Sequence, residues 1–360
     1  MISATERLAT AIETRWRKTD YSCYTFAEIA QSEMLKTDFI ALFSFELINQ
    51  FLESDSIKRI QIASEFSELH LKIFDNGKFY IEILNWWDKD TAIHDHGFVG
   101  VLLQLRGSAL NVIYDFSQQT AISHNLALGT LKLSTAYISQ PGDYHIIPPG
   151  RAEKHAVFHL EKPTVSMIVR THPISELSPQ LNYFPPYLQV NHSATDMAFN
   201  KKIKYFKMLA KIDNQQCRNE LIGELTRSSL TEQFWLLMKL ADFIFQPENI
   251  SLLNQYLPAC TERAPLSIQQ KLVISATLRR FSQFIIDHMK SLFDDSECRL
   301  FLSCLAASYN TQERAILLRQ FGFNQPDRQL QQIMQQLPPH LADYLRIILK
   351  NQSVGSGSNE

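Results

Sequence analysis

Three histidines are the residues of this sequence best suited to chemistry. His94 and His96 lie on either side of Asp95, and His155 follows later in the chain. Residues two apart on a β-strand point to the same face of the sheet, roughly 6.5–7 Å apart. Two imidazoles placed in this way can share one metal ion if a third ligand comes from a facing strand. The spacing therefore predicts a metal site made of His94, His96 and His155.

The chemistry of such a site depends on the ion. Three neutral imidazoles leave a divalent ion its full charge and several open positions, so a substrate and O₂ can bind together. Zn²⁺ with three histidines and a water would instead favour hydrolysis or hydration. Imidazole suits Fe, Zn, Cu and Ni alike, so the ligand type does not select the metal. The alternative at this point is that these are surface or hydrogen-bonded strand histidines in a barrel without metal.

The elements around these histidines have the pattern of short β-strands. Leu69, Leu71 and Ile73 alternate with polar residues, and residues 75–78 (Asp-Asn-Gly-Lys) are typical of a hairpin turn before a strand over residues 79–87. Further strands are expected at residues 99–105, 110–114, 129–133, 136–138, 145–147, 156–159 and 164–170. Many short strands separated by turn residues indicate a barrel or a sandwich.

Helical patterns flank this β-rich part on both sides. Leu8, Ile12 and Trp16 recur at helical spacing, and similar patterns continue to about residue 55. The proline-rich stretch 173–186 is expected to be an extended connector on the surface. From about residue 195 the pattern is helical again to the end of the chain, and the Gly- and Ser-rich last residues are expected to be flexible.

Composition excludes several classes of protein. The 360 residues are too many for one typical core, which makes two domains the expectation. A formal charge of −2 argues against a protein held to nucleic acid by bulk charge. No apolar run is long enough for a membrane span, and the first residues lack the order of a signal peptide. Five scattered cysteines without a Cys-X-X-Cys motif fit reduced thiols in the cytoplasm.

Two stretches resemble the histidine motifs of the cupin superfamily. His94-X-His96 followed by Gly107 is similar to the first motif, and Gly142, Pro148-Pro149-Gly150 and His155 are similar to the second, with two extra residues before the histidine. The first motif usually has a carboxylate three or four residues after its second histidine. Gly100 and Val101 stand there instead, so the resemblance implies a site of three histidines without glutamate.

Residues 66–175 more closely resemble the cysteine dioxygenase family. The similar segments are residues 76–79, 83–86, 93–96 and 163–169. The resemblance implies a cupin that holds Fe(II) with His94, His96 and His155 and binds a small thiol through its sulfur and amine. Both atoms of O₂ would then be added to the sulfur, giving a sulfinic acid. A basic residue holds the substrate carboxylate in that family, and Lys72 falls near its place, although lysine is not equivalent to arginine as a clamp.

The chain departs from that family at the relay of serine, histidine and tyrosine beside the iron. Ser166 matches the serine, but Ile168 and Arg170 stand at the other two places, and Gly100 or Val101 replaces the cysteine that some members crosslink to the tyrosine. Ser166, Ile168 and Arg170 share one strand face. If that face lines the barrel, Arg170 needs an anionic partner, either on the substrate or in an internal salt bridge.

Two more histidines lie on predicted strands. His145 and His159 are candidates to support a ligand histidine through its other ring nitrogen. The alternative is that both are hydrogen-bonded core or surface residues. The helical residues after 195 do not indicate a role. They could form a homodimer interface, bind a protein partner or cover the barrel.

Together these observations predict an α+β protein. We expect an N-terminal helical cap over residues 1–60, a cupin β-barrel of the jelly-roll type over 61–190, a separate all-α domain over 195–350 and a flexible tail over 351–360. The leading function is a mononuclear non-haem Fe(II) oxygenase that adds O₂ to a small anionic substrate, with Arg170 and Ser166 at the reacting groups. The alternatives are different oxidative chemistry at the three-histidine site on a non-thiol substrate, and a non-enzymatic cupin binding module that acts through its helical domain. Fe(II) is the expected metal, with Zn, Ni or another divalent ion as the alternatives.

Overall fold

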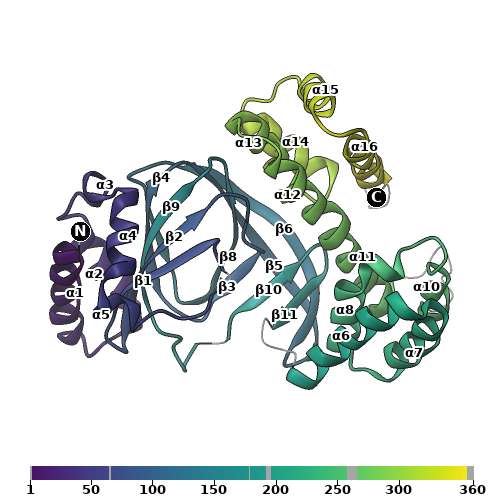
Figure 1. Ribbon diagram of the computed structural model, residues 1–360, viewed down its shortest axis with the longest axis horizontal. Coiled ribbons are helices and arrows are strands. Elements are labelled where there is room, and N and C mark those ends of the chain that lie inside the picture. Colours follow the sequence, from purple (N-terminus) through teal and green to yellow (C-terminus); the bar gives the residue numbers. More distant parts are fainter. Residues whose placement is uncertain (1, 65, 178, 192–195, 258–265, 355–360) are drawn as a thin grey trace. The chain divides into compact units, whose positions relative to one another are not determined.

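A computed structural model describes residues 2–64, 66–177, 179–191, 196–257 and 266–354 (Figure 1). The chain divides into two compact units. The first unit contains residues 1–114, 133–180 and 287–345, and the second contains residues 115–132, 181–286 and 346–360. The three histidines that were predicted to bind a metal all belong to the first unit.

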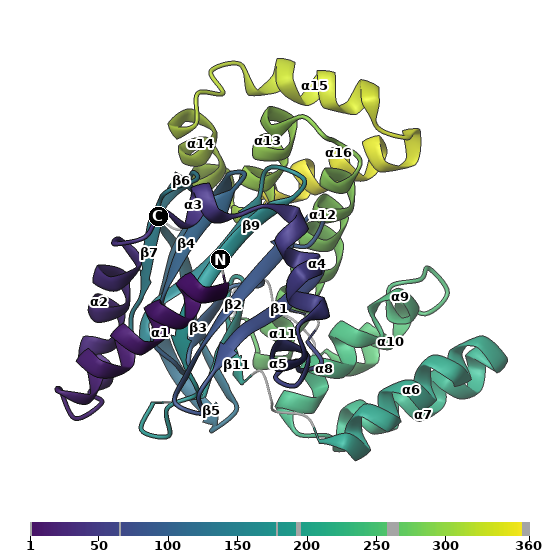
Figure 2. The ribbon, with the colours of Figure 1, turned by 60° about the vertical axis from the view of Figure 1, so that its left-hand side comes forward.

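The N-terminal helices cover one face of a β-sheet (Figure 2). They are α1 (Ile2–Arg17), α2 (Cys23–Met34), α3 (Phe39–Leu42), α4 (Phe45–Glu53) and α5 (Asp55–Lys58). Ile12 and Trp16 of α1 are buried in this interface and pack with Phe26 and Phe79. The helical spacing of apolar residues in the sequence is therefore explained by a stripe that faces the sheet.

The covered sheet has five strands in the order β1-β2-β9-β4-β7. They are β1 (Leu69–Asp75), β2 (Phe79–Trp86), β4 (Gly100–Arg106), β7 (Tyr144–Ile147) and β9 (Thr164–Thr171), and neighbouring strands are antiparallel. Side chains alternate between the two faces. Ile83 and Val169 pack under the helices, whereas Leu84 and Ile168 belong to a smaller apolar cluster on the opposite face, inside the barrel.

The second sheet follows the order β10-β11-β6-β5-β8-β3 and forms a barrel. Its strands are β3 (His94–His96), β5 (Ala109–Ser123), β6 (Leu126–Ser139), β8 (Gly150–His159), β10 (Leu181–Phe184) and β11 (Leu188–Asn191). In β3 and β8, which run antiparallel, His94 lies opposite His155 and His96 lies opposite Gly150. This pairing brings the two histidine motifs together.

Most of the second unit is helical. Its helices are α6 (Met197–Ile212), α7 (Asn214–Arg227), α8 (Leu230–Lys239), α9 (Ala241–Ile244), α10 (Ser251–Tyr256) and α11 (Ile268–Thr277), followed by a π-helical segment (Leu278–Gln283). Several of them begin at side chains that accept hydrogen bonds from exposed backbone N–H groups. Asp196 caps α6 in this way, and Ser229 forms a reciprocal capping box with Glu232 at α8.

The last helices are α12 (Phe284–Ser291), α13 (Ser296–Ala307), α14 (Thr311–Gln320), α15 (Pro326–Gln336) and α16 (Pro339–Val354). Residues 287–345 belong to the first unit, with the barrel. This differs from the predicted single all-α domain over 195–350. The sequence pattern showed the helices correctly, but it contains no signal for the polar contacts that attach α12 and α13 to the barrel.

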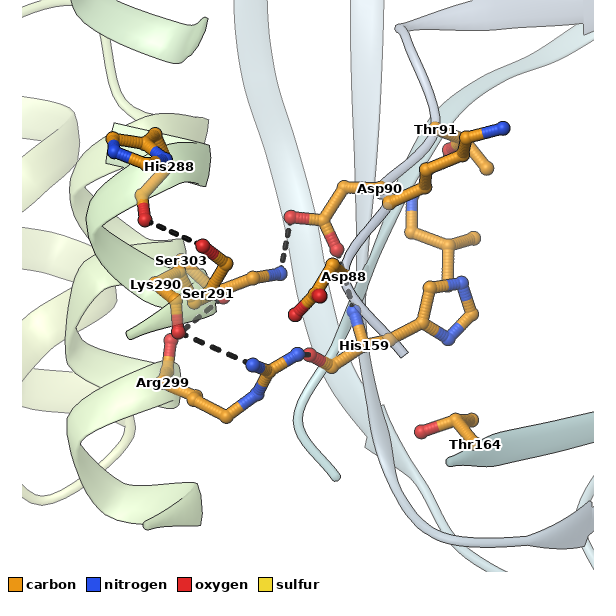
Figure 3. Close-up of polar contacts among 12 residues, drawn as sticks. Asp88, Asp90, Thr91, His159, Thr164, His288, Lys290, Ser291, Arg299 and Ser303 are labelled. Carbon is orange, nitrogen blue, oxygen red and sulfur yellow. Dashed lines mark hydrogen bonds and ion pairs between the residues drawn. The ribbon is translucent and has the colours of Figure 1, made fainter. Parts of the chain in front are cut away.

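Those contacts are buried charges (Figure 3). Lys290 of α12 forms an ion pair with Asp90, which precedes β3, and the two side chains are 1% and 2% exposed. Arg299 of α13 is fully buried and donates hydrogen bonds to the carbonyl oxygens of Trp87 and His159, at 3.1 and 2.9 Å. Burying charged groups is costly unless they are paired or hydrogen-bonded. The Lys290–Asp90 ion pair and the two hydrogen bonds of Arg299 therefore fix where α12 and α13 attach to the barrel.

The structure confirms the predicted α+β class, with N-terminal helices, a β-barrel and helices after it. Some predicted boundaries were wrong. Residues 129–133 and 136–138 form one strand, β6, and the stretch 173–186 that was expected to be a surface connector contains β10, whose residues are buried. Helix α16 continues to Val354, whereas the rest of the predicted tail and Cys260 lie outside the described residues. None of the described helices has the length and apolar character of a membrane crossing.

Candidate metal centre

His94, His96 and His155 converge inside the barrel. Their candidate ligand atoms all lie within 4.8 Å of one another. The ring centroids are 4.8 Å apart for His94 and His96, and 4.9 Å apart for each of the other two pairs. Each residue is at most 6% exposed. Three inward-facing imidazoles at these separations fit the donor set expected for a transition metal ion.

The electrostatics of the cluster favour neutral rings. Burial lowers the pKa of His96 well below its usual value of 6.5, and the neighbouring His94 and His155 lower it further. Burial, together with His94 and His145, likewise lowers the pKa of His155 well below that value. A metal ion binds the neutral form of imidazole, so these rings present lone pairs without having to lose a proton first.

Hydrogen bonds set which nitrogen of each ring is available. His94 Nδ1 lies 2.7 Å from the carbonyl oxygen of Ala92, which can only accept, so Nδ1 carries the proton and Nε2 has the lone pair. His155 Nδ1 lies 3.2 Å from Glu153 Oε1 without meeting hydrogen-bond geometry, so the carboxylate favours a proton on Nδ1 by its charge and leaves Nε2 as the candidate ligand atom. His96 Nδ1 is buried and has no hydrogen-bond partner among the described residues. The site therefore fits a metal ion on its own geometry.

His145 lies beside the three histidines, where it contacts the ring of His155. Its ring stacks on that of His155 at 5.6 Å, and its Nε2 lies 2.9 Å from Glu153 Oε1. Its Nδ1 lies 2.8 Å from the hydroxyl of Tyr137. His145 therefore belongs to a polar chain behind His155.

Apolar and aromatic side chains form the surroundings of the three histidines. Phe98 packs on His96 with ring centroids 4.7 Å apart, and Trp86, Leu84 and Ile168 join it in one buried cluster. Ser166 is buried on the same face of β9 as Ile168. A largely apolar wall lowers the local dielectric, which strengthens any charged interaction within the barrel.

Arg170 also lies on this inner face. Its guanidinium is 4.0 Å from the ring centroid of Phe98 and 4.7 Å from that of Tyr80. Its Nε lies 3.1 Å from Glu82 Oε1, and the side chain of Arg170 keeps 23% of its exposure. Of the two partners that the sequence left open for Arg170, the structure therefore contains the internal one, a buried carboxylate on β2.

Lys72 does not occupy an open position. Its side chain is 5% exposed, and its Nζ lies 2.7 Å from Asp75 Oδ2. The ammonium also lies 4.3 Å from the ring centroid of Tyr80. Of the two cations predicted to bind substrate, Lys72 is thus enclosed and paired, and Arg170 is the more accessible.

His159 lies apart from the three histidines, beside the attachment of α12 and α13 (Figure 3). It is 3% exposed, its ring stacks on Trp86 at 4.5 Å, and its backbone N–H donates to Asp90 Oδ1. Neither ring nitrogen has a hydrogen-bond partner within the described ranges. Burial, with Lys290 and Arg299 nearby, lowers the pKa of His159 well below its usual value. We conclude that it is a neutral core residue at this end of the barrel.

Sequence reasoning missed two acidic residues of the site. Glu153 stands two residues before His155, and Glu82 stands on β2 between residues of the inner face. The alternation of β2 did carry a signal, because Glu82 shares its strand face with the apolar Leu84 and Trp86. A carboxylate buried on such a face needs a charged or hydrogen-bonding partner. Glu153 carried no comparable signal, because the strand pairing that places it was not predictable.

Comparisons with known proteins give fold-level likenesses only. No protein-family model matches the chain, and no curated protein is similar to it in sequence. An RmlC-like cupin from Shewanella frigidimarina is 11% identical, with a TM-score of 0.21, over 30% of this chain and 77% of that chain. A hydroquinone 1,2-dioxygenase from Sphingomonas sp. TTNP3 is 12% identical, with a TM-score of 0.23, over 31% and 69%. A DMSP lyase from Ruegeria pomeroyi is 11% identical, with a TM-score of 0.23, over 35% and 60%.

Proposed function

We propose that this protein is a metal-dependent oxygenase of the cupin type, with His94, His96 and His155 as the metal ligands. The observation that supports the proposal is the convergence of three buried imidazoles, with ligand atoms within 4.8 Å of one another. A bound ferrous ion would supply open positions at which O₂ and a substrate can bind together. Three neutral ligands without a carboxylate would leave that ion its full charge, which favours an anionic substrate.

The residues of the chain itself would hold and orient the substrate. Arg170 is our candidate for the anionic group, because its side chain keeps 23% of its exposure whereas that of Lys72 keeps 5%. Glu82 forms an ion pair with the Nε side of the Arg170 guanidinium. The apolar cluster that contains Phe98 and Ile168 would keep water from the reacting groups. Ser166, buried on the same strand face, is the candidate hydroxyl near the substrate.

A resemblance to the cysteine dioxygenases motivates the choice of substrates to test. That family acts on small thiols, but Ile168 and Arg170 replace the histidine and tyrosine of its relay. We therefore propose a small anionic compound, derived from a thiol or an amino acid, as the substrate class. Oxidative chemistry on a non-thiol substrate at the same centre is the second candidate, because the three ligands are present while the relay is not.

Metal analysis is the first test. The protein would be purified anaerobically from cells, and its iron, zinc, nickel and copper would be measured per chain. We expect close to one iron per chain, and His96→Ala should lose it. His124→Ala is the matched control, because His124 is exposed and lies outside the cluster. A wild-type protein without stoichiometric metal, or a His96→Ala variant with unchanged metal, would overturn the proposed site.

Oxygen consumption is the second test. The iron-loaded protein would be mixed with cysteine, cysteamine and 3-mercaptopropionate, and O₂ uptake would be compared with sulfinate formed. Uptake matched by sulfinate supports thiol oxidation. Iron without turnover of any thiol would move the assignment to the non-thiol alternative. Arg170→Met should retain iron and lose turnover, because the substrate would lose its cationic partner.

A further inference from the structure

A chain of four polar side chains leads from the surface of the first unit to the metal ligand His155. Tyr137 of β6 is 37% exposed, and its hydroxyl lies 2.8 Å from His145 Nδ1 on β7. His145 Nε2 lies 2.9 Å from Glu153 Oε1 on β8. The same oxygen lies 3.2 Å from His155 Nδ1. Three strands from two sheets, β6, β7 and β8, thus contribute to one line of contacts.

When the imidazoles of His145 and His155 are both neutral, each hydrogen bond in this chain of side chains can pair one donor with one acceptor. The Tyr137 hydroxyl donates to His145 Nδ1, and His145 Nε2–H donates to the carboxylate of Glu153. His155 Nδ1 lies within ion-pair distance of the same carboxylate but outside hydrogen-bond geometry, and Nε2 is the ring nitrogen left for the metal. Burial, with Glu153 and Asp143 nearby, raises the pKa of Tyr137 above its usual value of 10.0, which keeps this hydroxyl a donor.

The three predicted ligands are supported in different ways. The Nδ1 of His94 is fixed by a neutral backbone carbonyl, and that of His96 has no hydrogen-bond partner within the described part of the chain. The Nδ1 of His155 has a carboxylate oxygen, Glu153 Oε1, 3.2 Å away. A carboxylate on the far nitrogen fixes the tautomer and the ring orientation of a ligand histidine and raises its basicity.

We propose that Glu153, held in place by His145 and Tyr137, is a positioning residue that strengthens His155 as a metal ligand. The inference rests on the metal site proposed above and adds its means of tuning. Glu153 and His145 each retain 18% of their side-chain exposure. The negative charge of Glu153 therefore lies at the edge of the site, where it acts on the metal through the ring of His155 and not by direct ligation.

Direct ligation is the competing arrangement. The ligand atoms of His145, Glu153 and His155 also lie within 4.8 Å of one another, so these residues could hold an ion of their own. That arrangement would break the contacts of His145 and His155 with Glu153 and would share the His155 ring between two ions. It predicts two ions per chain, whereas the positioning role predicts one.

The test is a titration of the metal-free full-length protein with Co²⁺, followed by the visible absorption of the bound ion. Wild type should bind one Co²⁺ per chain. Removing residues that support a ligand histidine typically weakens metal binding about 10–100-fold, and we expect that loss for Glu153→Ala. Glu153→Gln keeps an oxygen acceptor without the charge, so it should fall between wild type and Glu153→Ala. Its saturated Co²⁺ spectrum should also shift, because the basicity of His155 changes.

The matched control is Glu161→Gln, which removes the same charge from the loop that follows the same strand. Glu161 accepts a hydrogen bond from Ser108 and does not belong to the histidine cluster. The Co²⁺ affinity and the Co²⁺ spectrum of the Glu161→Gln variant should equal those of wild type. Thermal unfolding of each metal-free variant would verify that the fold is retained.

The outcomes separate the two proposals. One Co²⁺ in wild type with unchanged affinity and spectrum in Glu153→Ala would overturn the positioning role and leave the metal site standing. Two Co²⁺ per chain, reduced to one in Glu153→Ala, would overturn it in favour of direct ligation. No binding by wild type would overturn the metal site itself and the inference with it.

Discussion

Arg170 Nε lies 3.1 Å from Glu82 Oε1, between two adjacent strands of the barrel wall. Glu82 is almost completely buried, and its other carboxylate oxygen lies 2.6 Å from His70 Nε2. Arg170 thus has a counter-charge within the protein itself. The pair gives the inner wall a fixed cation without leaving it unbalanced in the absence of substrate.

Removing one partner of this pair should destabilise the protein. Arg170→Met removes the cation beside Glu82 and leaves that carboxylate in contact with His70, and we expect a loss of about 2–3 kcal/mol in the free energy of unfolding. The double variant Arg170→Met/Glu82→Gln should recover part of that loss, because no uncompensated charge remains. Urea unfolding monitored by tryptophan fluorescence measures both. Additive effects of the two single substitutions would contradict an energetic coupling between these residues.

The buried pair of Lys290 and Asp90 should contribute more. Both side chains are at most 2% exposed, so Lys290→Met leaves a carboxylate enclosed in the protein. We expect a loss of about 3–5 kcal/mol in the free energy of unfolding. Lys58→Met is the control, because Lys58 pairs with Asp55 on the surface, with exposures of 54% and 84%. A surface pair contributes about 0–1 kcal/mol. Equal losses in the two variants would therefore contradict the larger contribution expected of the buried Lys290–Asp90 pair.

Asp75 predicts a pH dependence of stability. Burial would raise the pKa of this carboxyl, but hydrogen bonds from Lys72, the backbone of Gly77 and His172 outweigh it and hold the pKa below 3.8. A carboxyl with a lowered pKa in the folded state stabilises the protein above its unfolded pKa, and that contribution is lost as the pH falls through the folded pKa. The difference in unfolding free energy between wild type and Asp75→Asn should therefore be largest near neutral pH and shrink in acid. A difference that stays constant below pH 3.8 would contradict this sign.

Gly100 has no room for a side chain. A Cβ at this position would lie 2.6 Å from the carbonyl oxygen of Val169 and 2.8 Å from Cβ of Arg170. Gly100→Ala must displace β9 beside Arg170, and we expect a loss of about 1–3 kcal/mol in unfolding free energy. Gly77→Ala is the comparison, because Gly77 has a φ of +79° but open space around it.

The two glycine variants should differ at the site as well as in stability. Gly77→Ala strains only a hairpin turn, so metal binding should stay at the wild-type level. Gly100→Ala moves Arg170, so it should reduce turnover or substrate affinity in addition to stability. Unfolding curves and the Co²⁺ titration would be measured on both. If Gly100→Ala were as stable as wild type, β4 and β9 would be able to move apart at this position without a loss in unfolding free energy.

Metal binding should stabilise the folded protein. A ligand that binds only the folded state at 100 times its dissociation constant adds about 2.7 kcal/mol. Chelation should therefore lower the midpoint of thermal unfolding, and added metal should restore it. His96→Ala should show no difference between the two conditions. A wild-type midpoint that is insensitive to chelation and to added metal would argue against the site.

Local patterns in the sequence predicted the helices, most strands and the convergence of the three histidines. The hairpin at residues 75–78 is an example, because its turn residues and the flanking alternation act over a few residues. The proximity of His94 and His155 was predictable only through the similarity of two motifs. The partners of Arg170 and Lys72 were not predictable, because the cross-strand register decides which charges meet.

Long-range attachments were the least predictable part. The helices after residue 284 look alike in sequence, yet α13 carries a fully buried arginine whose partners are backbone carbonyls far away in the chain. An apolar stripe indicates that a helix packs but not against what. The division of residues 195–350 into parts of two compact units therefore had to come from the three-dimensional arrangement.

The separation of Asp90 and Lys290 along the chain, 200 residues, also sets an order of events during synthesis. At elongation rates of about 5–20 residues per second, the partner of Asp90 leaves the ribosome roughly 10–40 s after the strand that follows Asp90. Throughout that interval the nascent barrel has to keep the carboxylate in water. The ion pair can form only after Lys290 has been synthesised, so a chain that ends before residue 290 would leave the Asp90 carboxylate without this buried partner.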